Sequence, residues 1–144
     1  MGPNSSSSRI EVTSRPSAII QQLEGLIEAH EAQWVQRLVV RSGERFDFVP
    51  VDSIDWIESA NNYTVLHCRP KDYIFGENLS TLEQRLDPSR FCRVHRCHIV
   101  NVTRIVAANA ITGGAYELEL RGGQRVKTGR QYSDSVRKLL KEGH

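Results

Sequence analysis

The sequence has few of the features that mark secreted or membrane proteins. Its 144 residues contain three cysteines, an odd number at no disulfide-like spacing, so a framework of paired disulfides is not expected. No apolar run approaches the roughly 18 residues that a membrane span needs. The serine-rich N-terminus lacks the apolar core of a secretory signal. These absences predict a cytoplasmic protein with reduced thiols and no membrane partner.

Sequence patterns that carry catalysis are also missing. No serine lies in a Gly-x-Ser-x-Gly elbow, and no nucleophile, base and orienting group can be matched to one another. The glycine pairs at 113–114 and 122–123 lack the spacing of a phosphate-binding loop and are typical of hairpin turns. We therefore predict that the protein is not an enzyme and binds no cofactor.

One cluster of residues contains competent zinc ligands. Cys92, His95, Cys97 and His98 lie within seven consecutive positions. If this stretch is a single strand, alternation places His95 and Cys97 on one face and Cys92 and His98 on the other, which separates the ligands. We therefore expect no metal site here.

Charge is present in both signs, but it is unevenly distributed. The net charge of the whole chain is only +2. Residues 43–87 contain nine acids and four bases, whereas residues 88–130 contain eight arginines and lysines against two glutamates. A basic half of this kind raises the potential toward phosphates, although ion pairs with the acidic half are an alternative use for any one base.

The N-terminal quarter divides into two segments. Residues 1–13 have the composition of a disordered or tag-like segment. Over residues 14–36, apolar side chains recur at three- and four-residue steps, which favours an amphipathic helix that Ser14 would cap. Such a helix either packs on its own domain or connects to another; we interpret it as a linker helix.

Residues 37–142 show a period of two, which predicts a mainly β domain. Short strands are expected at 38–41, 45–49, 53–58, 63–68, 72–76, 91–101, 104–108, 116–120 and 125–128. Asn61 and Asn62 favour a turn. Ser80 and Glu83 have the spacing of a capping box for one short internal helix, and Ser133 is the expected N-cap of a C-terminal helix.

Four motifs occur in an order that one protein family shares. They are IDWIESANNY at 54–63, LSTLE at 79–83, FCRVHRCHIVN at 91–101 and VKTGRQY at 126–132. Together they resemble the LytTR-type DNA-binding domain, which commonly forms the output half of bacterial response regulators. The resemblance covers about residues 38–140 and implies an elongated fold of several short antiparallel sheets.

The resemblance also implies how DNA is bound. Loops, rather than a recognition helix, enter successive major grooves of double-stranded DNA with repeated half-sites, and the protein is a homodimer on DNA. A receiver or other regulatory domain would lie N-terminal in the full-length protein. The DNA-facing groups of the family correspond here to Asn61, Asn62, His95, Arg96, Lys127, Thr128, Gly129 and Arg130.

The chemistry of the basic residues suggests different tasks. A guanidinium can grip guanine or a phosphate with two parallel hydrogen bonds, so we expect Arg130 to read a base and Arg96 to contact a base or a phosphate. Lys127 and Arg93 suit phosphates. The alternatives are ion pairs with the acidic half, and for Arg93 a stem that packs within the fold.

Three polar candidates have structural alternatives. Asn61 and Asn62 suit adenine, but asparagine in a turn needs no function. We expect His95 to orient a DNA-facing loop, with a phosphate contact as the other option.

The residues and the resemblance together predict the sequence-specific DNA-binding domain of a bacterial transcription regulator. The alternative is a metal- or ligand-sensing β module that binds protein partners through its basic half. A further possibility, redox control through Cys92 or Cys97, depends on thiols near basic groups.

Overall fold

The computed structural model describes residues 34–142. All of them except Trp34 belong to the second of two compact units, which begins at Val35. The predicted segment 1–13 and nearly all of the predicted helix 14–36 lie outside the described residues. None of the helices within 34–142 is long and apolar enough to cross a membrane.

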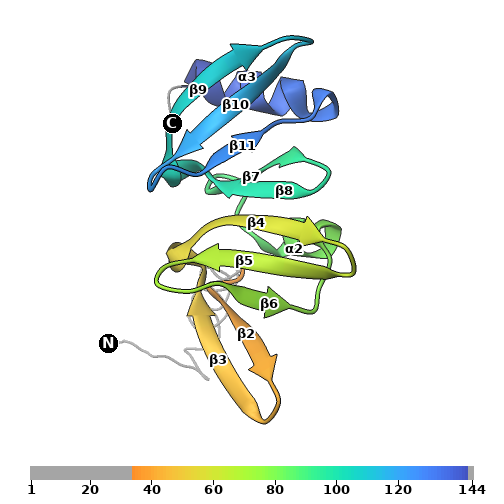
Figure 1. Cartoon of the computed structure of the whole chain (residues 1–144), viewed down its shortest axis with the longest axis vertical. Helices are drawn as coiled ribbons and strands as arrows, with labels where there is room; N and C mark the ends of the chain where they lie inside the picture. Colours follow the sequence, from red (N-terminus) through yellow and green to blue (C-terminus); the bar gives the residue numbers. More distant parts are fainter. Residues whose placement is uncertain (1–33, 143–144) are drawn as a thin grey trace, which may run out of the picture. The chain divides into compact units, whose positions relative to one another are not determined.

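The described unit is built mainly from strands in three antiparallel sheets (Figure 1). The first is a two-stranded hairpin, β2 (Arg37–Ser42) and β3 (Arg45–Pro50). The second has the strand order β6-β5-β4-β8-β7, and comprises β4 (Ile54–Ala60), β5 (Tyr63–Cys68), β6 (Tyr73–Phe75), β7 (Phe91–His95) and β8 (His98–Asn101). The third comprises β9 (Ile105–Ile111), β10 (Ala115–Leu120) and β11 (Arg125–Lys127).

Short helices complete the fold. The α-helices are α2 (Leu79–Arg85) and α3 (Ser133–Glu142), and the single 3₁₀ turns are η1 (Val51–Ser53), η2 (Val102–Arg104) and η3 (Arg130–Tyr132). This is the mainly β fold with one short internal helix and a C-terminal helix that the sequence predicts.

The five-stranded sheet separates two hydrophobic cores. Alternate side chains of a strand point to opposite faces, so the neighbours Trp56 and Ile57 on β4 lie in different cores. Ile57 packs with the buried residues of the β2–β3 hairpin and α2, and Trp56 packs with those of the three-stranded sheet and α3. Both faces of the five-stranded sheet are therefore packed against other elements, which holds its strands and the turns at their ends in place.

The prediction of one continuous strand over residues 91–101 is wrong. β7 and β8 are antiparallel partners, joined by a tight turn at Arg96 and Cys97, and His95 pairs with His98. Paired residues face the same side of a sheet, and the two rings lie 4.8 Å apart. The alternation argument used against a zinc site therefore does not apply; independently, no group of three or more potential ligands that could hold a metal occurs within residues 34–142.

The predicted cap of the short internal helix is also wrong. α2 is capped by Asn78, whose side chain accepts a hydrogen bond from the Thr81 N–H at 2.8 Å, so the helix begins before the predicted cap Ser80. The Ser133 hydroxyl donates to the carbonyl of Gly114 at 3.0 Å. The cap of α2 is therefore Asn78, directly before the helix, and the bonding partner of the Ser133 hydroxyl lies in the β9–β10 turn.

Candidate nucleic-acid interface

The antiparallel strands bring three connectors to the same edge of the fold, on the right of Figure 1. The Ser59 N–H donates to the Cys97 carbonyl at 2.9 Å, which joins the β4–β5 turn to the β7–β8 turn. The Gly129 N–H donates to the Val94 carbonyl at 2.8 Å, which joins the segment after β11 to the end of β7. We call residues 61–62, 95–97 and 127–130 together the connector edge.

Cations on the connector edge are available to a ligand. Arg96, Lys127 and Arg130 are exposed, and none of the ion pairs within residues 34–142 involves them. Asn61 and Asn62 are also exposed, and Asn61 has a left-handed backbone with φ 56°. The edge therefore presents hydrogen-bond donors and positive charge without a carboxylate to neutralise them.

Arg130 is positioned by a fourth connector that sequence reasoning missed. The β9–β10 turn contains Gly113, with φ 88°, and a Cβ atom placed there would lie 2.8 Å from Arg130 Nη2. The backbone conformation favours glycine at this position, and the guanidinium of Arg130 lies directly against it. The glycine pair in the sequence predicts the turn, but nothing local predicts its contact with Arg130.

His95 lies where two connectors meet. Its Nδ1 accepts a hydrogen bond from the Cys97 N–H at 3.0 Å, which closes the β7–β8 turn. A Cβ atom at Gly129 would lie 3.3 Å from His95 Cδ2, so the ring packs directly against the third connector. These contacts agree with the expectation that His95 orients a loop.

His95 is the first of four rings that contact one another in succession. His98 lies against His95, and Trp56 contacts His98 edge-on at 5.4 Å and stacks on His67 at 4.2 Å. Burial lowers the pKa of His98, and the neighbouring His95 lowers it further. The Nδ1 of His98 is buried without a hydrogen-bond partner, so both features favour a neutral imidazole.

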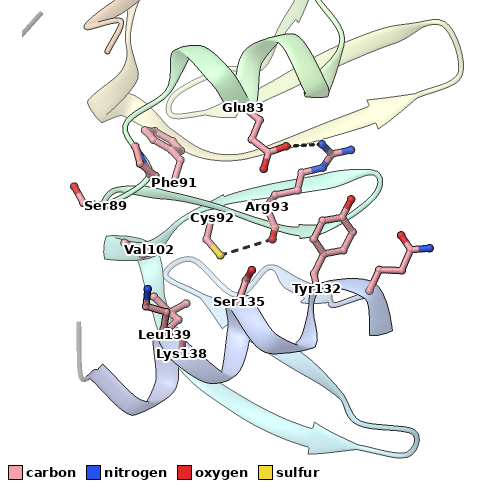
Figure 2. A pocket seen from close by; sticks show the side chains of 12 residues that line it. Glu83, Ser89, Phe91, Cys92, Arg93, Val102, Tyr132, Ser135, Lys138 and Leu139 are labelled. Carbon is pink, nitrogen blue, oxygen red and sulfur yellow. Dashed lines mark hydrogen bonds and ion pairs between the residues drawn. The ribbon is translucent and has the colours of Figure 1, made fainter. Parts of the chain in front are cut away.

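Arg93 is held within the fold. Its side chain is 10% exposed, and Nη1 pairs with Glu83 at 2.9 Å (Figure 2). Its guanidinium also donates to the carbonyls of His95 and Arg96 and lies 5.7 Å from the ring centre of Tyr132. The geometry favours the alternative in which Arg93 supports the connector edge from behind.

Thr128 and Gly129 also act through their structural contacts. Thr128 is 5% exposed, and its hydroxyl accepts a hydrogen bond from the Tyr116 N–H at 2.9 Å. The Thr128 N–H donates to the Tyr116 carbonyl, also at 2.9 Å. Together with the bond from Gly129 to Val94, these contacts fix the backbone between Lys127 and Arg130.

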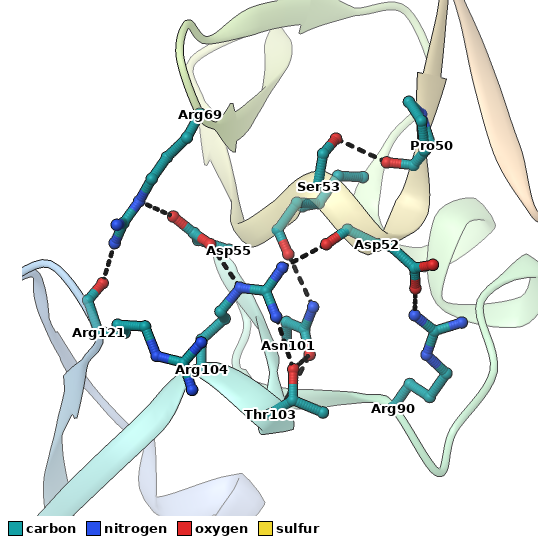
Figure 3. A network of polar contacts seen from close by, with 11 residues as sticks. Pro50, Asp52, Ser53, Asp55, Arg69, Arg90, Asn101, Thr103, Arg104 and Arg121 are labelled. Carbon is teal, nitrogen blue, oxygen red and sulfur yellow. Dashed lines mark hydrogen bonds and ion pairs between the residues drawn. The ribbon is translucent and has the colours of Figure 1, made fainter.

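Arginines at the other ends of the same strands are paired. Asp55, at the start of β4, accepts hydrogen bonds from Arg69 Nε at 2.9 Å and from Arg104 Nε at 2.8 Å (Figure 3). Arg90 pairs with Asp52. We call this group, with the nearby Asn101 and Thr103, the opposite edge. Its arginines connect the five-stranded sheet to η1 and to the three-stranded sheet.

The three cysteines are free thiols. Burial raises the pKa of Cys68 to about 11 and also raises that of Cys92, which disfavours the nucleophilic thiolate at both positions. Cys92 faces an open groove of about 700 Å³ between β7 and α3 (Figure 2). These pKa shifts do not favour redox control through Cys92.

Exposed arginine, lysine and asparagine side chains lie on adjacent connectors of this β domain, an arrangement typical of nucleic-acid-binding proteins. The model of the LytTr DNA-binding domain matches residues 44–141. The chain therefore belongs to the LytTR family, a family of DNA-binding domains used in transcription regulation. This confirms both the family and the mainly β fold that the motifs predict.

Two transcriptional regulators are similar in sequence to this chain. The chain is 29% identical over 108 residues to the CO-responsive transcriptional regulator RcoM of Rhodospirillum rubrum, covering 74% of this chain and 46% of that protein. It is 26% identical over 107 residues to the transcriptional regulatory protein LytR of Staphylococcus aureus, covering 74% and 44%. The chain thus spans less than half the length of these relatives.

A solved structure is also similar. The LytTr DNA-binding domain of a putative methyl-accepting/DNA response regulator from Bacillus cereus superposes with a TM-score of 0.68 at 26% sequence identity. The match covers 73% of this chain and 96% of that structure.

Proposed function

We propose that this domain binds double-stranded DNA sequence-specifically, as the output domain of a bacterial transcription regulator, with the connector edge entering the major groove. The observation that carries the proposal is the contrast between the two edges. Arg96, Lys127 and Arg130, which take part in none of the ion pairs of the described part of the chain, lie on adjacent connectors, whereas Arg69 and Arg104 at the opposite edge share one carboxylate. Unpaired cations on one side of a rigid scaffold suit a polyanion.

Within this edge we assign different roles. Arg130 reads a base: its guanidinium is exposed, lies beside Gly113 of the β9–β10 turn, and can form two parallel hydrogen bonds to guanine. Arg96 contacts a base or a phosphate, and Lys127 contacts a phosphate. Asn61 and Asn62 lie at the tip of the β4–β5 turn, where an amide can reach the adenine edge.

The remaining predicted residues position these contacts. Arg93, His95, Thr128 and Gly129 each bond or pack to the backbone of a connector. Their contribution to affinity is to keep the connectors in one arrangement before DNA arrives, which lowers the cost of ordering loops on binding.

The relatives support a proposal about the rest of the protein. Because the chain spans 46% and 44% of two transcriptional regulators, we propose that the full-length protein carries a receiver or other regulatory domain N-terminal to this one. It acts in the cytoplasm and binds repeated half-sites as a homodimer.

Selection of bound duplexes from a random pool tests the proposal. The selected duplex should bind at least a thousandfold more tightly than random DNA, as for other specific binders at about 10³–10⁷. Replacing Arg96, Lys127 and Arg130 together by alanine should abolish this preference. Arg121→Ala is the matched control, because Arg121 is an exposed arginine near the opposite edge. Equal losses in both variants would reject the connector edge as the interface.

A further inference from the structure

We propose that His95 is a positioning residue that works only as a neutral imidazole, so that protonation of His95 weakens DNA binding. The inference rests on the proposed function and adds a pH dependence to it. It assigns to one side chain the task of holding the β7–β8 turn and the third connector together.

The hydrogen bond at His95 Nδ1 requires the neutral ring. The donor is the backbone N–H of Cys97, at 3.0 Å, and a backbone N–H can only donate. Nδ1 must therefore carry a lone pair, which places the remaining ring proton on Nε2. Protonation at Nδ1 would set two donors against each other and break the bond that closes the turn.

The same ring also contacts the connector that carries Lys127 and Arg130. A Cβ atom at Gly129 would lie 3.3 Å from His95 Cδ2, and the Gly129 N–H bonds to the carbonyl of Val94, directly before His95. A ring that moves to escape the Cys97 N–H would push against this connector. Loss of one hydrogen bond thus affects groups on both sides of His95.

Charged and titratable groups surround His95 on several elements. His98 on β8 lies 4.8 Å away, and Arg93 on the same strand donates to the His95 carbonyl at 2.9 Å. The connector after β11 contributes the cations Lys127 and Arg130. Glu58 bonds to His67, behind His98. None of the ion pairs within residues 34–142 involves His95.

Charge alone predicts the opposite effect. An additional positive charge near a phosphate strengthens DNA binding through counterion release, so a histidine that contacts phosphate would bind better as the pH falls. A positioning histidine that accepts a hydrogen bond binds worse as the pH falls. The sign of the pH dependence therefore separates the two roles.

The test is a pH titration of DNA affinity with two variants of the full chain. The probe is the duplex selected from the random pool, at constant salt, from pH 8 to pH 5.5. His95→Asn keeps a side-chain acceptor that can bond to the N–H two residues on, without a titratable group. His95→Lys supplies a permanent positive charge without an acceptor. Circular dichroism establishes that each variant is folded.

We expect wild-type affinity to fall about five- to tenfold on acidification, the size of one lost hydrogen bond. His95→Asn should bind somewhat more weakly than wild type at pH 8, because it lacks the ring that packs on Gly129, but its affinity should not fall further on acidification. His95→Lys should bind weakly at every pH. Affinity that rises on acidification in wild type, or a His95→Lys variant that binds as tightly as wild type, would overturn the inference.

A measurement without DNA keeps the two proposals distinguishable. Nitrogen NMR of the imidazole ring should show the proton on Nε2 at pH 8, and a proton on Nδ1 would overturn the inference directly. If the ring has the expected tautomer but no duplex is selected, the proposed function fails rather than the geometry. If DNA binds specifically and its affinity does not fall with pH, only the role of His95 fails.

Discussion

The connector edge and the opposite edge use arginine in different ways. Arg96 and Arg130 are exposed and lack a carboxylate partner within residues 34–142, whereas Arg69 and Arg104 donate to the two oxygens of Asp55. The basic segment 88–130 supplies arginines to both edges. Net charge along the sequence therefore does not locate the interface. The lack of an ion pair does not locate it alone either, because Arg121 is also exposed and takes part in none of the ion pairs within residues 34–142; what marks the connector edge is that several such cations lie on adjacent connectors.

This difference has a physical cause at the opposite edge. The side chain of Asp55 is only 13% exposed, and a carboxylate removed from water is costly unless it is paired and hydrogen-bonded. Two guanidiniums satisfy it and at the same time connect separate elements of the fold. At the connector edge, none of the ion pairs within residues 34–142 draws Arg96 or Arg130 inward, and both side chains stay exposed.

The largest effect is expected from breaking the opposite edge. Asp55→Ala removes the shared acceptor of Arg69 and Arg104, and should lower the free energy of unfolding by about 2 kcal/mol, less than the roughly 3–5 kcal/mol of a fully buried pair because Arg69 is half exposed. Urea denaturation measures the change. Asp47→Ala is the control: its partner Arg45 is 73% exposed, so it should change stability by less than about 1 kcal/mol.

The same variant also tests how separate the two edges are. The folded fraction of Asp55→Ala should keep its DNA affinity and its preference for the selected duplex, because Asp55 lies at the other end of β4 from the β4–β5 turn. A strong loss of specificity in the folded protein would show that the edges are coupled and that the comparison between them is too simple.

An effect on DNA affinity rather than on stability is expected from removing a base-reading side chain. Arg130→Ala should weaken binding to the selected duplex by about 1–3 kcal/mol and relax specificity at one base pair. Binding to random DNA should change much less. Competition titrations with single-base variants of the duplex measure both quantities, and an equal loss on specific and random DNA would assign Arg130 to a phosphate instead.

A sequence-independent loss is expected from removing a phosphate contact. Lys127→Ala should weaken selected and random duplexes alike and lower the slope of log affinity against log salt by about one. Titration at several salt concentrations measures this slope. Lys138→Ala, a change of the same charge on α3, should leave the slope unaltered. An unchanged slope for Lys127→Ala would mean that Lys127 makes no phosphate contact.

Much of this fold could be predicted from local sequence signals. The period of two between residues 37 and 68 predicts β2 to β5, and the asparagine pair predicts the turn at Asn61, because these features depend on neighbouring residues. The β7–β8 hairpin was missed because its turn lacks glycine. A side-chain acceptor on His95 supplies the contact that closes it.

The candidate site was harder to predict, because its parts meet only in the tertiary structure. The motifs correctly marked three connectors, but they did not separate exposed Arg96 from Arg93, which is 10% exposed and paired with Glu83. The contact between Gly113 and Arg130 joins positions 17 residues apart. Pairing and burial of arginine are set by distant residues, so no local pattern reports them.

The smallest effect concerns the tip of the connector edge, where Asn61 has either a backbone role or a base-reading role. Its φ of 56° is accessible to glycine at no steric cost and unfavourable for alanine. Asn61→Ala should therefore lower the free energy of unfolding by about 0.5–1 kcal/mol, and Asn61→Gly should leave it nearly unchanged. Urea denaturation measures this difference, and equal stability of both variants would contradict the backbone role. If Asn61→Gly keeps its stability but loses preference for one base pair of the selected duplex, the amide reads DNA; if specificity is also kept, Asn61 only shapes the turn that presents Asn62.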